Sequence, residues 1–134
     1  RVAEKHNLIV NFEPKPLKGD WNGSGCHTNF STERMRDGDE KDGLDYIMDA
    51  IKKLELKHDE HMKVYGENNE ERMSGSHETS SYDKFSYGVG NRSCSIRIPT
   101  KTEEEKEGYF EDRRPGSNCD PYLVTSILLQ TVME

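Results

Sequence analysis

The sequence predicts an α+β fold, because its 134 residues contain both helical and strand-like patterns. Across 44–65, apolar residues recur at spacings of three and four, as on one face of an amphipathic helix. Asp120-Pro121 begins a second helical pattern, because Asp is a favoured N-cap and Pro is favoured at the first helical position. Residues 26–32 and 93–99 are rich in residue types that favour strands.

The chain begins with one predicted strand and a glycine-rich segment. His6–Glu13 is a short apolar run that ends at prolines, which predicts a buried strand. Gly19–Thr32 then holds three glycines in seven positions, which allow a tight turn and a close approach to a ligand. After the glycines, the alternation of a strand would place His27, Asn29 and Ser31 on one face. That polar face suits a metal and a phosphorylated ligand, with a plain loop and edge strand as the alternative.

The helix predicted across 44–65 is followed by Gly66, a favoured C-terminal residue. His58 and His61 lie three residues apart on it, at a spacing that metal ligands can use. Charged residues surround both histidines, so we expect them at the surface. Two methionines of this helix are expected to fill the core: Met48 and Met62.

The second half of the chain is predicted to contain a long loop, a strand, a turn and a helix. Residues 72–90 show no period, which is typical of a functional loop. Residues 93–99 alternate as a strand that ends at its proline, and Thr102–Glu107 is predicted to be an acidic surface turn. The helix after Asp120 would bury a stripe made of Val124, Ile127, Leu128 and Thr131.

Composition limits the classes of function. Hydrophobic residues make up 31% and charged residues 34%, with a formal net charge of −7, so we expect a folded piece whose core is completed by other chain. The acidic balance argues against nucleic acid or an anionic membrane as a partner, and no apolar run approaches the ~20 residues of a membrane span. The three cysteines form no C-x-x-C pair, which predicts reduced thiols and a cytoplasmic location, with an organelle as the alternative.

Four segments resemble, in order and in spacing, glutamine synthetases of the eukaryotic (type II) class. They are Gly19–Thr32, Arg72–Thr79, Gly88–Pro99 and Gly108–Pro115. The resemblance extends from about Gly19 to the end. It implies an antiparallel sheet that bears the site, with helices packed on one side. It also implies that residues 1–134 are part of the catalytic domain, without the small N-terminal domain and the upstream strands that carry further metal carboxylates.

The resemblance implies ATP-dependent ligation of ammonia to L-glutamate through a γ-glutamyl phosphate intermediate. Two alternatives are a non-catalytic structural or nucleotide-binding subunit of the same family, and a γ-glutamyl ligase that uses another amine. The resemblance further implies a homo-oligomer, a decamer of two pentamers, with active sites between subunits.

The metal expected for this reaction is Mg²⁺ or Mn²⁺. An imidazole and a carboxylate suit these ions, and the resemblance assigns them to His27 and Glu111. Such ions take about six ligands, so we expect this chain alone to bind them weakly.

Five arginines stand in Gly- and Ser-rich segments, where guanidinium groups can clamp phosphates and carboxylates: Arg72, Arg92, Arg97, Arg113 and Arg114. Ordinary surface ion pairs are the alternative for each. The resemblance implies that glutamate is bound by Asn22, Gly23, Arg72 and Arg113. It implies that the nucleotide is bound by Asn29, Ser31, Arg92, Arg97 and Tyr109.

The resemblance also implies two catalytic residues. Arg92 would neutralise the γ-phosphoryl group during transfer. Glu78 would lie on a flap that closes over the acyl phosphate, excludes water and helps to deprotonate ammonium. A loop acid without function is the alternative for Glu78.

Overall fold

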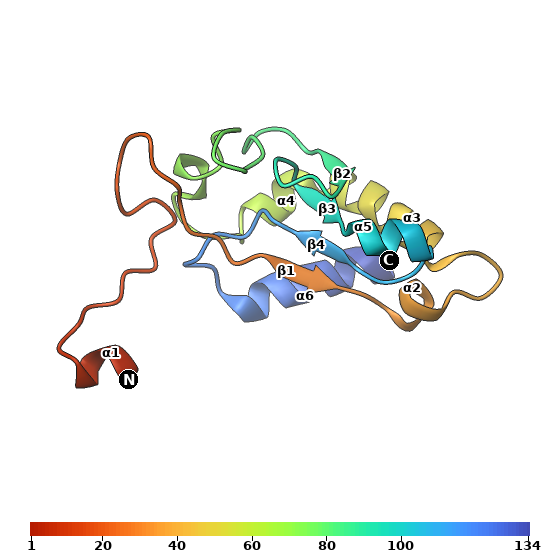
Figure 1. Cartoon of the computed structure of the whole chain (residues 1–134), viewed down its shortest axis with the longest axis horizontal. Helices are drawn as coiled ribbons and strands as arrows, with labels where there is room; N and C mark the ends of the chain where they lie inside the picture. Colours follow the sequence, from red (N-terminus) through yellow and green to blue (C-terminus); the bar gives the residue numbers. More distant parts are fainter.

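A computed structural model describes residues 1–134, and its mixed architecture confirms the predicted α+β class (Figure 1). The strands are β1 (Thr28–Phe30), β2 (Tyr87–Val89), β3 (Ile96–Ile98) and β4 (Phe110–Asp112). The helices are α1 (Val2–Lys5), α2 (Glu33–Asp37), α3 (Gly43–Leu56), α4 (His58–Met62), α5 (Thr100–Glu105) and α6 (Pro121–Met133), with a short 3₁₀ helix η1 (Asn69–Glu71).

The four strands form one sheet in the order β1-β4-β3-β2. β4 pairs antiparallel with β1 and with β3, as predicted. β2 instead joins β3 in parallel, so the sheet is not antiparallel throughout. The expectation of loop across 72–90 is also wrong at 87–89, because a Tyr-Gly-Val strand is too short to show a period in the sequence.

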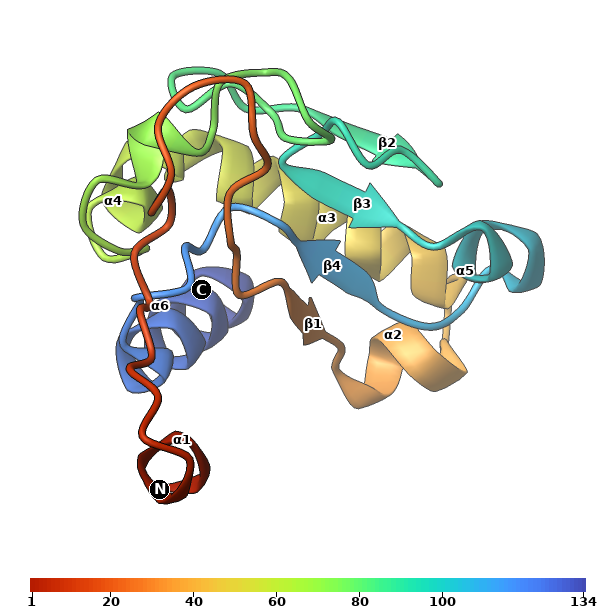
Figure 2. The same cartoon turned by 60° about the vertical axis from the view of Figure 1, so that its left-hand side comes forward.

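The sheet has one buried face and one polar face. Phe110 and Asp112 of β4 and Ile96 and Ile98 of β3 are buried on the core side. α3 and α6 both lie behind this side of the sheet and pack on it (Figure 2). Full burial of such apolar side chains contributes about 1.5–3 kcal/mol each. The other face is left to polar residues.

The helix predicted across 44–65 is divided into α3 and α4. Lys57 separates them with φ −106° and ψ 19°, outside the helical range. The prediction that His58 and His61 lie at the surface is wrong, because they are 7% and 0% exposed. Their acidic neighbours face solvent, whereas both imidazoles turn inward and find polar partners. The core positions of Met48 and Met62 are confirmed.

Two further expectations are wrong. His6–Glu13 forms no strand, and Ile9 is 98% exposed, because the segment extends away from the sheet and pairs with no strand (Figure 1). Thr102–Glu107 is not a turn: α5 occupies Thr100–Glu105, where a run of Glu and Lys favours helix after Pro99.

The C-terminal helix is as predicted. Asp120 caps α6, with its carboxylate accepting from the backbone N–H of Tyr122 at 2.8 Å. Val124, Leu128 and Thr131 are buried, and Ile127 packs against the core while partly exposed. None of the helices combines the length and the apolar character that crossing a membrane requires.

Candidate active site

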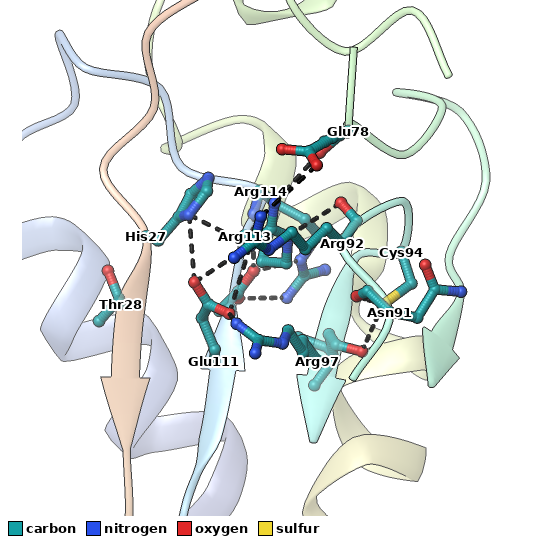
Figure 3. A network of polar contacts seen from close by, with 12 residues as sticks. His27, Thr28, Glu78, Asn91, Arg92, Cys94, Arg97, Glu111, Arg113 and Arg114 are labelled. Atoms are coloured by element: carbon teal, nitrogen blue, oxygen red, sulfur yellow. Dashed lines mark hydrogen bonds and ion pairs between the residues drawn. The ribbon is translucent and has the colours of Figure 1, made fainter. Parts of the chain in front are cut away.

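Polar side chains from three strands meet on the open face of the sheet. The register sets Asn29 of β1 opposite Glu111 of β4, and Glu111 opposite Arg97 of β3. Residues directly opposite each other in an antiparallel pair share one face. These three residues therefore form a row across the sheet, and His27 lies beside it just before β1 (Figure 3).

Glu111 is the centre of this group. Its Oε1 lies 3.1 Å from His27 Nδ1 and 3.2 Å from Arg113 Nη1. Its Oε2 lies 3.2 Å from Arg97 Nη1. The Glu111 side chain is only 13% exposed, which strengthens these charge-assisted contacts relative to surface ion pairs. The structure thus brings together His27 and Glu111, the two predicted metal ligands.

The Glu111 carboxylate also orients the imidazole of His27. Burial and the positive charge of Arg113 lower the pKa of His27, and the charge of Glu111 opposes this. His27 Nδ1 lies closer to Glu111 than to Arg113 Nη1, which is 3.4 Å away, so Nδ1–H donates to the carboxylate. A neutral imidazole in this tautomer keeps a free lone pair on Nε2. This form of histidine can bind a divalent metal.

Arg113 connects the sheet to two loops. Its Nε donates to the carbonyl of Arg92 at 3.1 Å, and its Nη2 donates to the carbonyl of Glu78 at 3.1 Å. The side chains of Arg92 and Glu78 lie 3.6 Å apart and are 61% and 62% exposed. They lie on the loop side of the Glu111 group (Figure 3). The two predicted catalytic residues are therefore close to each other and to Arg113, and both remain accessible.

Glu78 lies in a strained turn. The N–H of Thr79 donates to the carbonyl of Ser76 at 3.1 Å, and the central residues His77 and Glu78 have φ +55° and +59°. Positive φ at both central positions is typical of a type I′ turn, and costs about 1 kcal/mol or more for each residue that is not glycine. His77 Nε2 lies 2.7 Å from Asp20 Oδ1. This contact attaches the Glu78 loop to the glycine-rich segment.

Arg72 is buried beneath the glycine-rich segment. Its Nη2 donates to the backbone carbonyls of residues 113–115 at 2.8–3.3 Å. A Cβ on Gly23 would lie 2.4 Å from Arg72 Cγ, and one on Gly25 would lie 2.9 Å from Arg72 Nη1, so this approach requires glycine. Burial and the charge of Arg113 lower the pKa of Arg72 to about 10. Asn22, next to Gly23, is exposed.

Two predicted nucleotide contacts lie apart from the Glu111 group. Ser31 follows β1, and its hydroxyl accepts from Arg36 Nη1 at 2.8 Å. Tyr109 precedes β4 and is 40% exposed. No hydrogen bond joins either residue to Glu111 or Arg113.

Arg97 has an unsatisfied donor. Its Nε is the one buried side-chain nitrogen or oxygen of the chain without a hydrogen-bond partner. An unpaired buried donor costs about 1–3 kcal/mol. This N–H therefore lacks an acceptor within the chain.

One cavity of the chain lies apart from this site. It measures about 830 Å³ and is lined by α2, α3 and the end of α6, with Lys41, Tyr46 and Met133 among its residues. None of the predicted site residues lines it.

An ionic network that the sequence did not reveal lies on the core face of β4 and just after it. Asp112 Oδ1 accepts from the backbone N–H and the Nε of Arg114 at 3.0 and 2.9 Å, and Oδ2 accepts from its Nη2 at 2.7 Å. Both side chains are fully buried. Burial alone would raise the pKa of Asp112, but the charge of Arg114 and the hydrogen bonds lower it. The signal was the order acid-acid-base-base at 111–114, which gives each face of the strand one acid and one base.

The donor set fits a divalent metal only in part. The chain contains no group of three or more His, Cys, Asp or Glu side chains arranged to hold an ion. Glu111 supplies carboxylate oxygens and His27 supplies an imidazole nitrogen, and these donors suit Mg²⁺ or Mn²⁺. Because these ions take about six ligands, the remaining ligands must come from outside this chain.

Comparison with known proteins gives a consistent result. Residues 47–134 match the family described as glutamine synthetase, catalytic domain. A putative glutamine synthetase of Acanthamoeba polyphaga mimivirus is 58% identical over 134 residues, 100% of this chain and 37% of the relative. A glutamine synthetase of Neurospora crassa is 57% identical over 131 residues, 98% of this chain and 35% of the relative.

Plant proteins are similar to the same extent. A cytosolic isozyme of glutamine synthetase from Pinus sylvestris is 52% identical over 133 residues, 99% of this chain and 36% of the relative. Plant relatives include chloroplastic forms as well. The chain spans about a third of the length of these relatives. It belongs to the glutamine synthetase family, among the eukaryotic types, and its residues 47–134 are catalytic-domain sequence.

Proposed function

We propose that this chain forms part of the active site of an ATP-dependent ligase that joins ammonia to L-glutamate through γ-glutamyl phosphate. The observation that carries the proposal is the convergence of His27, Arg97 and Arg113 on the Glu111 carboxylate, beneath Glu78 and Arg92. Family membership supports the same reaction.

His27 and Glu111 would hold Mg²⁺ or Mn²⁺, together with carboxylates from outside the chain. The bound ion supplies positive charge for the phosphate oxygens. The neutral tautomer of His27 and the low exposure of Glu111 support this assignment. In that role Glu111 would give up contacts with Arg97 and Arg113, which hold its carboxylate oxygens at 3.2 Å in the chain alone.

Arginines would bind the two anionic substrates. Arg113 and Arg72, with Asn22 and Gly23, contact glutamate in this proposal. Arg72 is held rigidly by three carbonyls, and its Nη1 points toward Gly25.

The unpaired Nε–H of Arg97 would donate a hydrogen bond to an oxygen of a nucleotide phosphate. Asn29, next to Glu111 in the sheet, lies close enough to contribute to the same binding site. Ser31 and Tyr109 would contact the nucleotide farther along the strands.

Glu78 and Arg92 would act on the reacting groups. Arg92 balances the charge on the transferred phosphoryl group, and its exposure leaves it free to reach that group. The Glu78 carboxylate accepts a proton from ammonium, so that ammonia attacks the acyl phosphate. The turn that carries Glu78 covers the site and keeps water away from the acyl phosphate.

The assembled enzyme would be a cytoplasmic homo-oligomer. We propose a decamer of two pentamers, in which residues 1–134 are part of the catalytic domain and neighbouring subunits complete each site. The cytosolic relative supports the location.

The test is the ATP-dependent formation of γ-glutamyl hydroxamate from glutamate and hydroxylamine with Mn²⁺. Glu111→Gln should abolish the product, and Glu107→Gln, at an exposed acid nearby, should not. Full activity of the Glu111→Gln enzyme would overturn the assignment of Glu111. Comparing ammonium with larger amines as acceptors separates a glutamate–ammonia ligase from a γ-glutamyl ligase that uses another amine.

A further inference from the structure

The hydroxyl of Tyr65 stands between β4 and α6. It lies 2.7 Å from Asp112 Oδ2 and 2.6 Å from His61 Nδ1. His61 Nε2 lies 2.8 Å from the hydroxyl of Thr131 on α6. Tyr65, His61 and Asp112 are fully buried, and Thr131 is 1% exposed. These four polar groups thus form a buried series of hydrogen bonds from α6 to β4.

The direction of each hydrogen bond is determined. Asp112 is ionised beside Arg114 and can only accept, so Tyr65 donates to it. The Tyr65 oxygen then accepts Nδ1–H of His61, whose Nε2 accepts from Thr131. Burial and the charge of Arg114 lower the pKa of His61 to about 4, so His61 is neutral at pH 7, as this arrangement requires. Removing the Tyr65 hydroxyl would leave Nδ1–H of His61 without an acceptor and would leave Asp112 Oδ2 with Arg114 Nη2 as its remaining donor.

The same strand connects this chain of hydrogen bonds to the active site. Successive side chains of a strand point to opposite faces, so a rotation of β4 that moves Asp112 also moves Glu111 and Arg113. Their key contacts are at 3.1 Å to His27 and 3.1 Å to the Glu78 carbonyl. Both distances are close to the upper end of normal hydrogen-bond lengths. A displacement of a few tenths of an ångström would therefore weaken them.

We propose that Tyr65 is a positioning residue for the active site: by holding Asp112 on the core face of β4, its hydroxyl directs Glu111 and Arg113 toward His27 on the opposite face. His61 and Thr131 orient that hydroxyl. The kinetic part of this inference rests on the proposed ligase function. The structural part concerns the chain alone.

The structural part is tested with Tyr65→Phe, which removes only the hydroxyl. Ile51→Val, at a buried apolar position of α3 that makes no hydrogen bond to Asp112, is the control for a general loss of core stability. Tyr82→Phe removes a hydroxyl from another tyrosine that packs against the core. Amide hydrogen exchange is measured at Arg113, whose N–H donates to the carbonyl of Ser95 at 2.9 Å, and at residues of α3 as the reference.

Tyr65→Phe should accelerate exchange at Arg113 about tenfold more than exchange in α3. Ile51→Val should accelerate both equally, and Tyr82→Phe should change neither. Equal acceleration at Arg113 and α3 in Tyr65→Phe would mean that Tyr65 stabilises the core without positioning β4, and would overturn the inference.

The kinetic part uses the same variants in the active enzyme. Loss of a residue that orients metal ligands typically costs 10–100-fold in affinity or activity, so Tyr65→Phe should raise the KM for glutamate and the half-saturating Mn²⁺ concentration about tenfold. Thr131→Ser keeps the hydroxyl, so both values should equal those of the wild type. Thr131→Val removes the hydroxyl, so both values should rise toward those of Tyr65→Phe. Unchanged KM and Mn²⁺ values in Tyr65→Phe would overturn the inference. A wild-type enzyme without ligase activity would instead overturn the proposed function, and the exchange comparison would still decide the role of Tyr65.

Discussion

The two faces of β4 carry the same kinds of charge in different states. On the core face, Asp112 and Arg114 are fully buried, and every oxygen of the carboxylate is satisfied. On the open face, Glu111 and Arg113 form a similar pair at 3.2 Å, but the group around them includes a guanidinium donor without an acceptor. The core pair has all its carboxylate oxygens paired, whereas the pair on the open face, whose side chains are 8% and 13% exposed, lies beside a donor that still lacks an acceptor.

This difference indicates how one short strand serves both stability and binding. The buried pair costs desolvation energy and is stable only because its geometry is complete. We expect the pair on the open face to be able to release Glu111 to a ligand while the core pair stays intact. From this comparison we expect substitutions on the open face to lower activity with little change in the free energy of unfolding. We expect substitutions on the core face to lower mainly the free energy of unfolding.

The largest effect is expected from Arg92→Ala on the open side. An arginine that balances transferred phosphoryl charge contributes about 10³-fold or more to kcat. The Arg92 side chain is 61% exposed, so the free energy of unfolding should change by less than about 0.5 kcal/mol. Hydroxamate kinetics and urea denaturation measure the two quantities. A retained rate would remove Arg92 from the mechanism.

Asp112→Ala should show the opposite behaviour. It leaves the Arg114 guanidinium buried without its carboxylate, and breaking such a pair typically costs about 3–5 kcal/mol. The midpoint of urea denaturation should fall accordingly. Lys101→Ala, which removes an exposed ion pair with Glu105, is the control and should have little effect. Equal stability of Asp112→Ala and the control would contradict the role of the core face.

Lowering the pH should reduce the free energy of unfolding, because His61 on the core side is neutral in the fold. His61 has a pKa of about 4 in the fold, below its ordinary value of 6.5, so the unfolded chain binds more protons between these values. Stability should therefore fall as pH falls from 6.5 toward 4, by about 3 kcal/mol in all. His27, whose pKa is also lowered, adds to the same slope.

Urea denaturation at a series of pH values checks this dependence. His6→Gln, at an exposed histidine, should leave the slope unchanged. A free energy of unfolding that stays constant between pH 6.5 and 4.5 would show that His61 is protonated in the fold.

Gly23→Ala is expected to have the smallest effect on stability and on the KM for glutamate among these changes. The added Cβ would meet Arg72 Cγ at 2.4 Å and the carbonyl of Pro14 at 2.5 Å. Overpacking of this kind typically costs about 1–3 kcal/mol. The KM for glutamate should rise more than it does in Ser24→Ala, an exposed neighbour. An identical KM in the two variants would separate Gly23 from the Arg72 contact.

The sequence predicted most of the elements that carry the open face. The β1 and β3 strands, α6 and its Asp120 cap follow from residue types and spacing that act locally. The pairing of His27 with Glu111 came from a resemblance in several motifs, because 84 residues separate them and no local pattern connects them. The sequence did not reveal that Arg72 faces backbone carbonyls, since such contacts leave no pattern in residue types.

The failures have a common physical cause. His58 and His61 stand among charged residues in the sequence. Only the three-dimensional structure reveals their buried hydrogen-bond partners, which are Arg114 for His58 and Tyr65 and Thr131 for His61. His6–Glu13 has the composition of a strand, yet a strand needs a neighbour to pair with, and this segment has none in the chain. Local pattern identifies which residues prefer burial or pairing, but not whether a partner is available.

The Ser76–Thr79 turn has a practical consequence. Both of its central residues, His77 and Glu78, are L-amino acids in a backbone region that D-amino acids adopt without strain. A short linear peptide that copies residues 74–81 would not keep this shape, whereas a cyclic peptide with D-residues at the two central positions would. Such a peptide would reproduce the backbone shape of the Ser76–Thr79 turn apart from the rest of the chain.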